Sequence, residues 1–193
     1  MRTWLAAILA MTFTTPAAAQ WAAGAEFGVV GFGPAARDSG SDVGADRTTI
    51  IGVRVTRGNP RHAVGIRMRY GKSGVRFTDG DVSVVQEHVV KSTEVSVFGA
   101  ARLVSIGRAS ALLVEAGPTL TIWTPSGSPT RSRGGGALAL AWVVPATRGL
   151  AAVLRFETSV SGSLFDAVND LPSGATRRTT WRQGFLVEVR RTF

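Results

Sequence analysis

Apolar and polar residues alternate along this chain with a period of two, a pattern that few folds accommodate over so many segments. Side chains of an extended strand point alternately to opposite faces, so the alternation gathers the apolar residues on one side. In residues 184–193 one face is apolar and carries Phe185, Val187, Val189 and Phe193. The opposite face carries Glu188, Arg190 and Thr192. This segment is predicted to be a strand with an apolar side and a charged side.

The same alternation recurs in eight segments that are separated by turn-forming residues. The segments cover residues 21–33, 47–57, 62–78, 82–104, 111–123, 134–144, 150–163 and 180–193. Turn chemistry is clearest at residues 58–61 (Gly-Asn-Pro-Arg), 79–81 (Asp-Gly-Asp) and 147–149 (Thr-Arg-Gly), each of which contains glycine. No uninterrupted apolar run approaches the roughly 18 residues that a transmembrane helix needs. The sequence therefore predicts one all-β domain.

The connections between these segments alternate in length. Those after the second, fourth and sixth segments are short, whereas the others are long or extend the strands themselves. Residues 34–46 and 164–179 are predicted to be loops. Short turns at one end and long loops at the other are typical of up-and-down membrane β-barrels. An even number of strands places both ends of the barrel sequence on the short-turn side.

Charged residues occupy the faces opposite the apolar ones. The basic members are Arg54, Arg67, Arg69, Arg102, Arg155, Arg182 and Arg190, and the acidic members are Glu26, Glu94, Glu115, Glu157 and Glu188. Inside an eight-stranded barrel, whose interior is just wide enough for side chains to fill, these groups are expected to pair. In a soluble sandwich or barrel with an apolar interior, the same charges would instead face water.

Aromatic residues favour the membrane barrel over the soluble alternative. Trp21, Trp142 and Phe193 fall at the short-turn ends of their segments, and Tyr70, Trp123 and Trp181 fall at the long-loop ends. Two aromatic girdles at the two membrane surfaces would give this distribution. We therefore predict an eight-stranded antiparallel up-and-down transmembrane β-barrel over residues 20–193.

The first 19 residues are predicted to be a cleaved signal peptide. Arg2 provides a short positive region, residues 4–11 form an apolar core, and small residues precede a cleavage site after Ala19. The alternative is a short transmembrane anchor, for which this apolar core is too short. The chain contains no cysteine, which excludes a disulfide framework and a thiolate metal site.

The closing segment, which ends on Phe193, resembles the last strand of bacterial outer-membrane β-barrels. Together with the eight alternating segments, it makes the chain similar to the small eight-stranded family of the OmpA transmembrane domain and OmpX. This resemblance implies export to the bacterial outer membrane and insertion by the barrel-assembly machinery. The assembly signal would then comprise Gly184, Phe185, Val187, Val189 and Phe193. Arg191 departs from the aromatic residue that the family commonly has at that position.

The resemblance also implies a monomer that contacts outer-membrane lipid and lipopolysaccharide. Its expected role is non-enzymatic: a structural contribution to envelope integrity, or adhesion, with the lumen filled by ion pairs. The alternative is a narrow passive pore with a weak anion preference, because the predicted lumenal arginines outnumber the glutamates by seven to five. The hairpin at residues 75–90 is similar to the protruding edge of OmpX-type proteins and is a candidate site for an extracellular partner.

No pattern of catalytic, metal-binding or cofactor-binding residues emerges from the sequence. The two histidines, His62 and His88, are predicted to lie near opposite ends of one hairpin, which argues against a shared metal site. The net charge of +9 is not accompanied by the aromatic-rich basic elements of nucleic-acid-binding domains. We therefore expect neither catalysis, nor a cofactor, nor nucleic-acid binding.

Overall fold

The computed structural model describes residues 19–38, 41–59, 61–107, 110–165, 176–177 and 179–193. Apart from Ala19, the predicted signal peptide lies outside these residues. Every regular element in the described ranges is a strand: β1 (Gln20–Phe32), β2 (Ala36–Asp38), β3 (Ser41–Ala45), β4 (Thr48–Gly58), β5 (His62–Asp79), β6 (Val82–Ile106), β7 (Ser110–Pro125), β8 (Arg131–Thr147), β9 (Leu150–Ser161), β10 (Thr176–Arg177) and β11 (Thr180–Thr192). Within the same ranges, no helix is long and apolar enough to cross a membrane.

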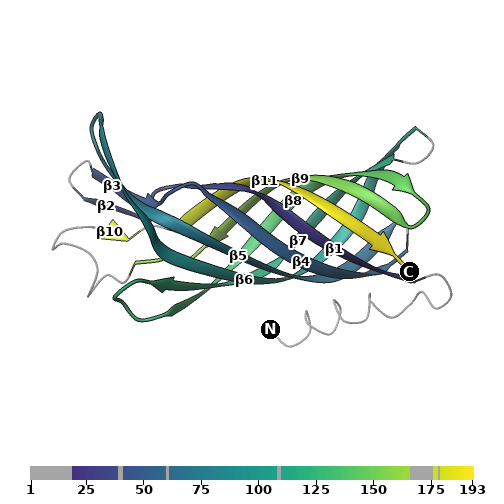
Figure 1. The fold of residues 1–193 in the computed structure, drawn as a ribbon, viewed down its shortest axis with the longest axis horizontal. Coiled ribbons are helices and arrows are strands. Elements are labelled where there is room, and N and C mark those ends of the chain that lie inside the picture. The colour runs from purple at the N-terminus through teal and green to yellow at the C-terminus, as the bar shows by residue number, and fades with distance from the viewer. Residues whose placement is uncertain (1–18, 39–40, 60, 108–109, 166–175, 178) are drawn as a thin grey trace.

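Eight long strands pair in a closed ring. Each pairs antiparallel with its neighbours in the order β1, β4, β5, β6, β7, β8, β9 and β11. Strand β11 then pairs with β1, with Ala22 opposite Thr192 and Phe32 opposite Arg182, so the ring closes. The strands run obliquely around a cylinder (Figure 1). The predicted eight-stranded antiparallel barrel is confirmed. Alternation and turn chemistry together had identified all eight strands of the ring.

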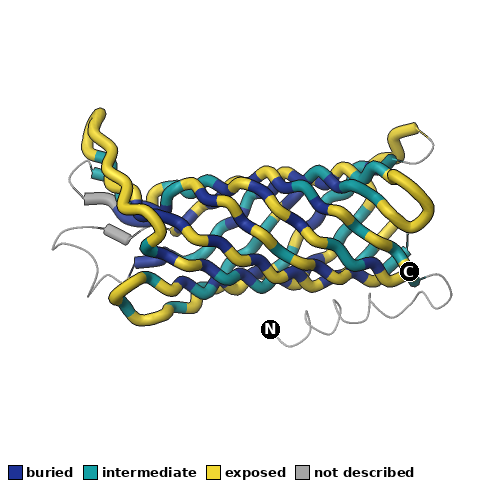
Figure 2. The backbone as a smooth tube through the Cα atoms, viewed as in Figure 1, coloured by how far each residue is buried: buried dark blue, intermediate teal, exposed yellow. Residues whose placement is uncertain are grey.

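Exposed and buried residues alternate along these strands, as Figure 2 shows. In β11 the side chain of Phe185 is 54% exposed, whereas the next residue, Leu186, is completely buried. The outer wall is apolar and includes Phe27, Ile51, Val53, Ile66, Val97, Leu138, Leu140, Phe156 and Val189. The buried face carries charged side chains, among them Arg54, Arg69, Glu115 and Glu188. This distribution is the reverse of that in a soluble protein, and so continuous an apolar surface indicates a lipid-facing wall.

The two ends of the barrel differ. At one end, here called the terminal end, β1 begins and β11 ends. Tight turns occur there, and the positive φ angles of Gly107 and Gly149 suit glycine because it has no Cβ. At the opposite end, here called the loop end, the sheet continues past the ring. Strand β3 pairs with β5, β2 pairs with β3, and β10 pairs with β2.

The three short strands at the loop end were predicted to be loops, and this part of the prediction was wrong. Beyond the start of β4 at Thr48, β3 takes over the place beside β5, pairing Ala45 with Val75 and Ser41 with Asp79. The strands β2, β3 and β10 have three, five and two residues. Segments this short carry almost no alternation, so periodicity does not reveal them.

The hairpin between β5 and β6 projects beyond the ring at the loop end (Figure 1). Its register shifts between Ser73 and Val75, where three residues of β6 oppose a single residue of β5. His88, one of these three β6 residues, has a positive φ of 57°, which is unusual for a residue other than glycine. This bulge bends the hairpin, and residues 79–88 beyond it are all exposed.

Candidate functional site in the barrel interior

Six arginines and five glutamates meet inside the barrel. They come from seven of the eight ring strands: Glu26, Arg54, Arg67, Arg69, Glu94, Glu115, Arg155, Glu157, Arg182, Glu188 and Arg190. The eighth strand, β8, places the small side chains of Ala139 and Ala141 on the same inner face, where both are buried. Small residues on this wall leave room for the long side chains that reach across from the others.

One half of this cluster surrounds two glutamates. Arg54 donates from both terminal nitrogens, with Nη2 3.0 Å from Glu115 Oε1 and Nη1 3.1 Å from Glu188 Oε2. Arg155 donates to the same two carboxylates, through Nε to Glu115 at 3.0 Å and through Nη2 to Glu188 at 2.6 Å. Arg190 Nε reaches the other oxygen of Glu188 at 2.8 Å. Each carboxylate is therefore shared by at least two guanidinium groups.

The other half is built around Arg69. Its Nε lies 2.5 Å from Glu26 Oε1, and its Nη1 lies 2.5 Å from Glu157 Oε1. Arg67 donates to the second oxygen of Glu157 at 2.6 Å. Arg182 pairs with both Glu157 and Glu94, which brings the fifth carboxylate into the cluster. Planar guanidinium groups suit such shared contacts because they present several donors in a fixed geometry.

Arg155 joins the two halves, because its Nη1 lies 2.6 Å from Glu26 Oε2. The result is one continuous network that contains one more positive than negative charge. All of its side chains except that of Arg190, which is half-buried, are buried, and those of Arg155 and Glu188 are completely inaccessible. Removing one partner from a buried ion pair typically costs about 3–5 kcal/mol, because the remaining charge stays buried and uncompensated. The network is therefore a polar core that ties the opposite walls of the barrel together.

Phe98 of β6 fills space among these charges. Its ring lies 4.3 Å from the guanidinium carbon of Arg54 and 5.7 Å from that of Arg67, within the range of cation–π attraction. A cavity beside it, which Arg67, Glu115 and Glu157 also line, measures about 10 Å³. That is room for roughly one water molecule. Sequence reasoning did not single out Phe98, although it lies on the same strand face as Glu94 and Ser96.

Arg102 was predicted to belong to the network, and this prediction was wrong. Its side chain is exposed and donates a hydrogen bond to Ser105 at 3.3 Å. Strand β5 begins at His62, which is opposite Ala101, so Arg102 lies beyond the last residue pair of these two strands. Alternation assigns a face to each residue, but it does not show where the neighbouring strand ends.

Trp123 was predicted to lie in an aromatic girdle, and this prediction was also wrong. Its side chain is only 1% exposed and points inward, with its ring in edge contact with that of Phe32 at 5.8 Å. The alternation of β7 already placed Thr119 and Thr121 on the inner face, which is the face that Trp123 shares. Tryptophan as a residue type suggested a location at the membrane surface. The position of Trp123 on the inner face of its strand instead directs the side chain into the barrel.

The other predicted girdle residues lie on the outer wall. Trp21, Tyr70, Trp142, Trp181 and Phe193 are all exposed. At the terminal end the guanidinium groups of Arg57 and Arg191 lie over the rings of Trp21 and Phe193, at 5.5 and 5.4 Å. Of the predicted assembly signal, Phe185, Val189 and Phe193 are exposed, Val187 is half-buried, and Gly184 faces inward.

An apolar cluster, here called the plug, lies at the loop end of the barrel. Its buried members are Ala35, Ala36, Ala45, Val75, Val90, Trp123, Leu164 and Phe165. Hydrogen bonds hold the segment after β9 in this plug: Arg131 Nη1 donates to the carbonyl of Leu164 at 3.0 Å, and Arg133 Nε to that of Ser163 at 2.7 Å. Ser163 Oγ in turn donates to the carbonyl of Ala35 at 2.9 Å. Sequence reasoning missed the plug, although Leu164 and Phe165 are an apolar pair at the start of a predicted loop.

The described residues show no arrangement suited to metal binding. Among them, no group of three or more His, Cys, Asp or Glu side chains comes together as a metal site would require. His62 begins β5 at the terminal end, whereas His88 lies in the hairpin at the loop end. Glu87 Oε2 lies 3.8 Å from His88 Nδ1, and both side chains are exposed.

A closed antiparallel ring with an apolar outer wall and a charged core defines a small membrane β-barrel. Solved structures of bacterial outer-membrane proteins share this fold. Outer membrane protein OprG from Pseudomonas aeruginosa has a TM-score of 0.61 and 10% identity, with 91% of this chain and 96% of that chain covered. Neisserial surface protein A has a TM-score of 0.61 and 8% identity, with 92% and 100% covered. No protein-family model and no curated protein matches the chain.

Proposed function

We propose that this chain is a non-enzymatic protein of the bacterial outer membrane, with a structural role in envelope integrity or a role in adhesion. The proposal rests on the continuous ion-pair network. Its side chains fill the lumen between β1 and β9, the space that an open pore would leave to water. The apolar plug above it closes the loop end. A barrel sealed at two levels is suited to a mechanical or surface role rather than to transport.

The proposed location rests on the outer wall. Apolar residues cover it, and Tyr70 and Trp181 stand at its loop end as interfacial anchors would. In this arrangement the terminal end faces the periplasm and the loop end faces outward. The proposal includes export by the predicted signal peptide, insertion by the barrel-assembly machinery through residues 184–193, and a monomer in contact with lipid and lipopolysaccharide.

Adhesion would use the β5–β6 hairpin. Phe77, Val82 and Val84 are apolar and exposed there. The outer part of β5 pairs with β3, but the ladder between β6 and β7 begins only at Val90. Among the described residues, none pairs with the other edge of residues 82–88 of β6, which is therefore open to the outside. Such an edge can accept a strand from another protein through main-chain hydrogen bonds.

Replacing two exposed valines of this edge tests the adhesive role. Cells that display the protein should aggregate or adhere more than cells that lack it, and Val82→Lys with Val84→Lys should abolish the difference. Charged side chains at a strand edge discourage strand addition. Unchanged adhesion by a correctly folded double variant would contradict this part of the proposal.

Single-channel recording in planar bilayers tests the sealed lumen. The purified protein should show no stable open level, and a known porin recorded under the same conditions provides the positive control. A stable open level whose conductance falls in Glu115→Ala or Glu157→Ala variants would overturn the proposal in favour of a narrow pore.

A further inference from the structure

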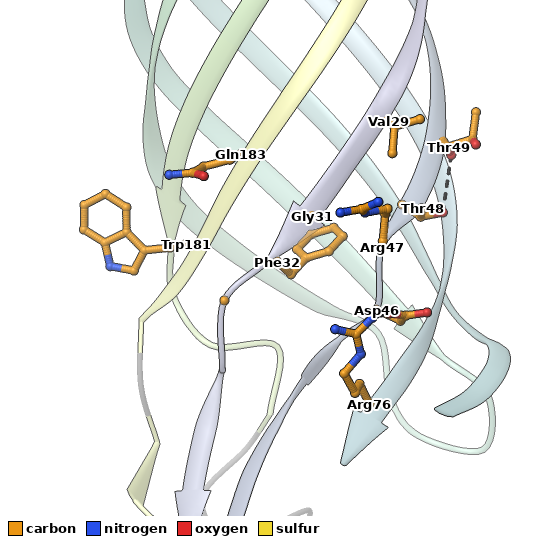
Figure 3. A pocket seen from close by; sticks show the side chains of 11 residues that line it. Val29, Gly31, Phe32, Asp46, Arg47, Thr48, Thr49, Arg76, Trp181 and Gln183 are labelled. Atoms are coloured by element: carbon orange, nitrogen blue, oxygen red, sulfur yellow. Dashed lines mark hydrogen bonds and ion pairs between the residues drawn. The ribbon is translucent and has the colours of Figure 1, made fainter. Parts of the chain in front are cut away.

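The outer wall is hollowed near the loop end, where β1, β4 and β11 meet (Figure 3). The pairing of β1 with β4 ends at Val30 and Thr48, whereas β1 stays paired with β11 as far as Phe32 and Arg182. Beyond Val30, β1 and β4 therefore separate. Gly31 lies in the gap, and even an added Cβ there would meet no atom within 4 Å. The resulting groove has a volume of about 1010 Å³.

Two kinds of side chain line this groove. Val29 and Trp181 are apolar, and both are exposed on the outside of the barrel. Arg47 and Arg76 provide positive charge and lie across the groove from Trp181, on the same side as Val29, as Figure 3 shows. Arg76 is paired with Asp46. The Arg47 side chain is exposed, and among the described residues it has no ion-pair partner.

A second groove, of about 470 Å³, adjoins the first and shares Arg47 with it. Its lining adds Tyr70 and Lys72, which follow each other on the outward face of β5. Three cationic side chains thus stand on the outside of the barrel, between Trp181 on one flank and Tyr70 on the other. Glu87 of the hairpin also borders the second groove, so the excess of positive charge is greatest in the first.

The groove lies at the level where a membrane protein meets lipid headgroups. Arg47 immediately precedes Thr48, which is opposite Val30, and the amide of Gly33 donates to the carbonyl of Trp181 at 2.8 Å. The cations and Trp181 are therefore at the same end of the outer wall. Tryptophan marks the interfacial region of membranes, and a guanidinium group at this depth meets phosphate oxygens rather than acyl chains.

We propose that this groove binds the phosphorylated headgroup of an outer-leaflet glycolipid, the lipid A part of lipopolysaccharide. Arg47 and Arg76 hold a phosphate, which a guanidinium group binds through two parallel hydrogen bonds. Val29 and Trp181 contact an acyl chain, and Thr49 and Gln183 offer polar groups to the sugar. The site rests on the proposed outer-membrane location but does not depend on a sealed lumen.

Binding of lipid A to the purified protein in detergent, followed by native mass spectrometry, tests the site. The protein should bind lipid A more tightly than dephosphorylated lipid A with the same acyl chains. Arg47→Gln and Arg76→Gln should each weaken binding of lipid A about fivefold, the effect typical of one basic residue near an anionic lipid surface. Arg148→Gln, in the exposed turn at the terminal end, removes the same charge and should leave binding unchanged.

Heat-modifiable migration on a gel shows that each variant is folded before its binding is measured. Equal binding of the two lipids would overturn the proposal, because it would leave only a non-specific apolar contact. So would displacement of lipid A by millimolar inorganic phosphate, or unchanged binding by the Arg47→Gln and Arg76→Gln variants. Because the assay uses purified protein, a conducting lumen would refute the sealed barrel without affecting this result.

Discussion

The position of a residue on its strand, more than its type, determines its role in this barrel. Trp123 and Trp181 are both tryptophans near the loop end, yet Trp123 is buried in the plug and Trp181 is 57% exposed on the outer wall. Arg155 and Arg102 were both assigned to the lumen by alternation. Arg155 pairs with three glutamates, whereas Arg102 lies beyond the start of β5 and is exposed.

Replacing Arg155 with methionine is expected to destabilise the barrel strongly. The substitution keeps much of the side-chain volume but leaves Glu26, Glu115 and Glu188 each short of one positive partner. The expected loss in the free energy of unfolding is about 3–5 kcal/mol. Urea unfolding of the protein in lipid vesicles measures it.

Arg102→Met is the matched control for this prediction. Because the Arg102 side chain is exposed and, among the described residues, makes its one side-chain hydrogen bond to Ser105, its replacement should change the free energy of unfolding by no more than about 0.5 kcal/mol. Similar losses in the two variants would show that the buried network does not stabilise the barrel.

At the level of single elements, long strands were predictable and short ones were not. The ring strands have between 11 and 25 residues, enough for alternation to reveal them. The sequence could also indicate that the β5–β6 hairpin extends past the ring, because valines continue on both sides of its turn. The plug escaped prediction because it is built from isolated apolar residues of separate strands and loops, which become neighbours only when the barrel closes.

Truncating Trp123 tests whether the plug stabilises the loop end. Trp123→Ala removes the largest fully buried side chain and its contact with Phe32. The expected loss in the free energy of unfolding is about 3–5 kcal/mol, as for other buried aromatic residues. Urea unfolding in vesicles measures this loss, and Trp181→Ala provides the comparison.

Trp181→Ala should cost less than Trp123→Ala, because the Trp181 side chain already lies on the outer wall. Quenching of tryptophan fluorescence by a water-soluble quencher adds an independent check. Trp123 should be shielded in the folded barrel, so its removal should take away a slowly quenched component. A larger loss for Trp181→Ala, or no change in quenching for Trp123→Ala, would contradict a closed plug.

For the whole molecule, the sequence predicts which face each residue occupies but not which residues meet across the lumen. Glu26 contacts Arg69 of β5 and Arg155 of β9, which are 43 and 129 residues away along the chain. Such contacts depend on how the strands tilt and stagger around the ring, and the alternation of a single strand contains no information on either. The architecture was therefore predictable, whereas the connectivity of the ion-pair network required coordinates.

The proposed function and the proposed lipid site both require this chain to be a folded barrel in the outer membrane. Separation of inner and outer membranes, followed by gel electrophoresis with and without boiling, tests both parts together. The protein should be recovered in the outer-membrane fraction, and the unboiled protein should migrate differently from the boiled one because the barrel resists detergent. Recovery in the soluble fraction, or a band that does not shift on boiling, would contradict the account.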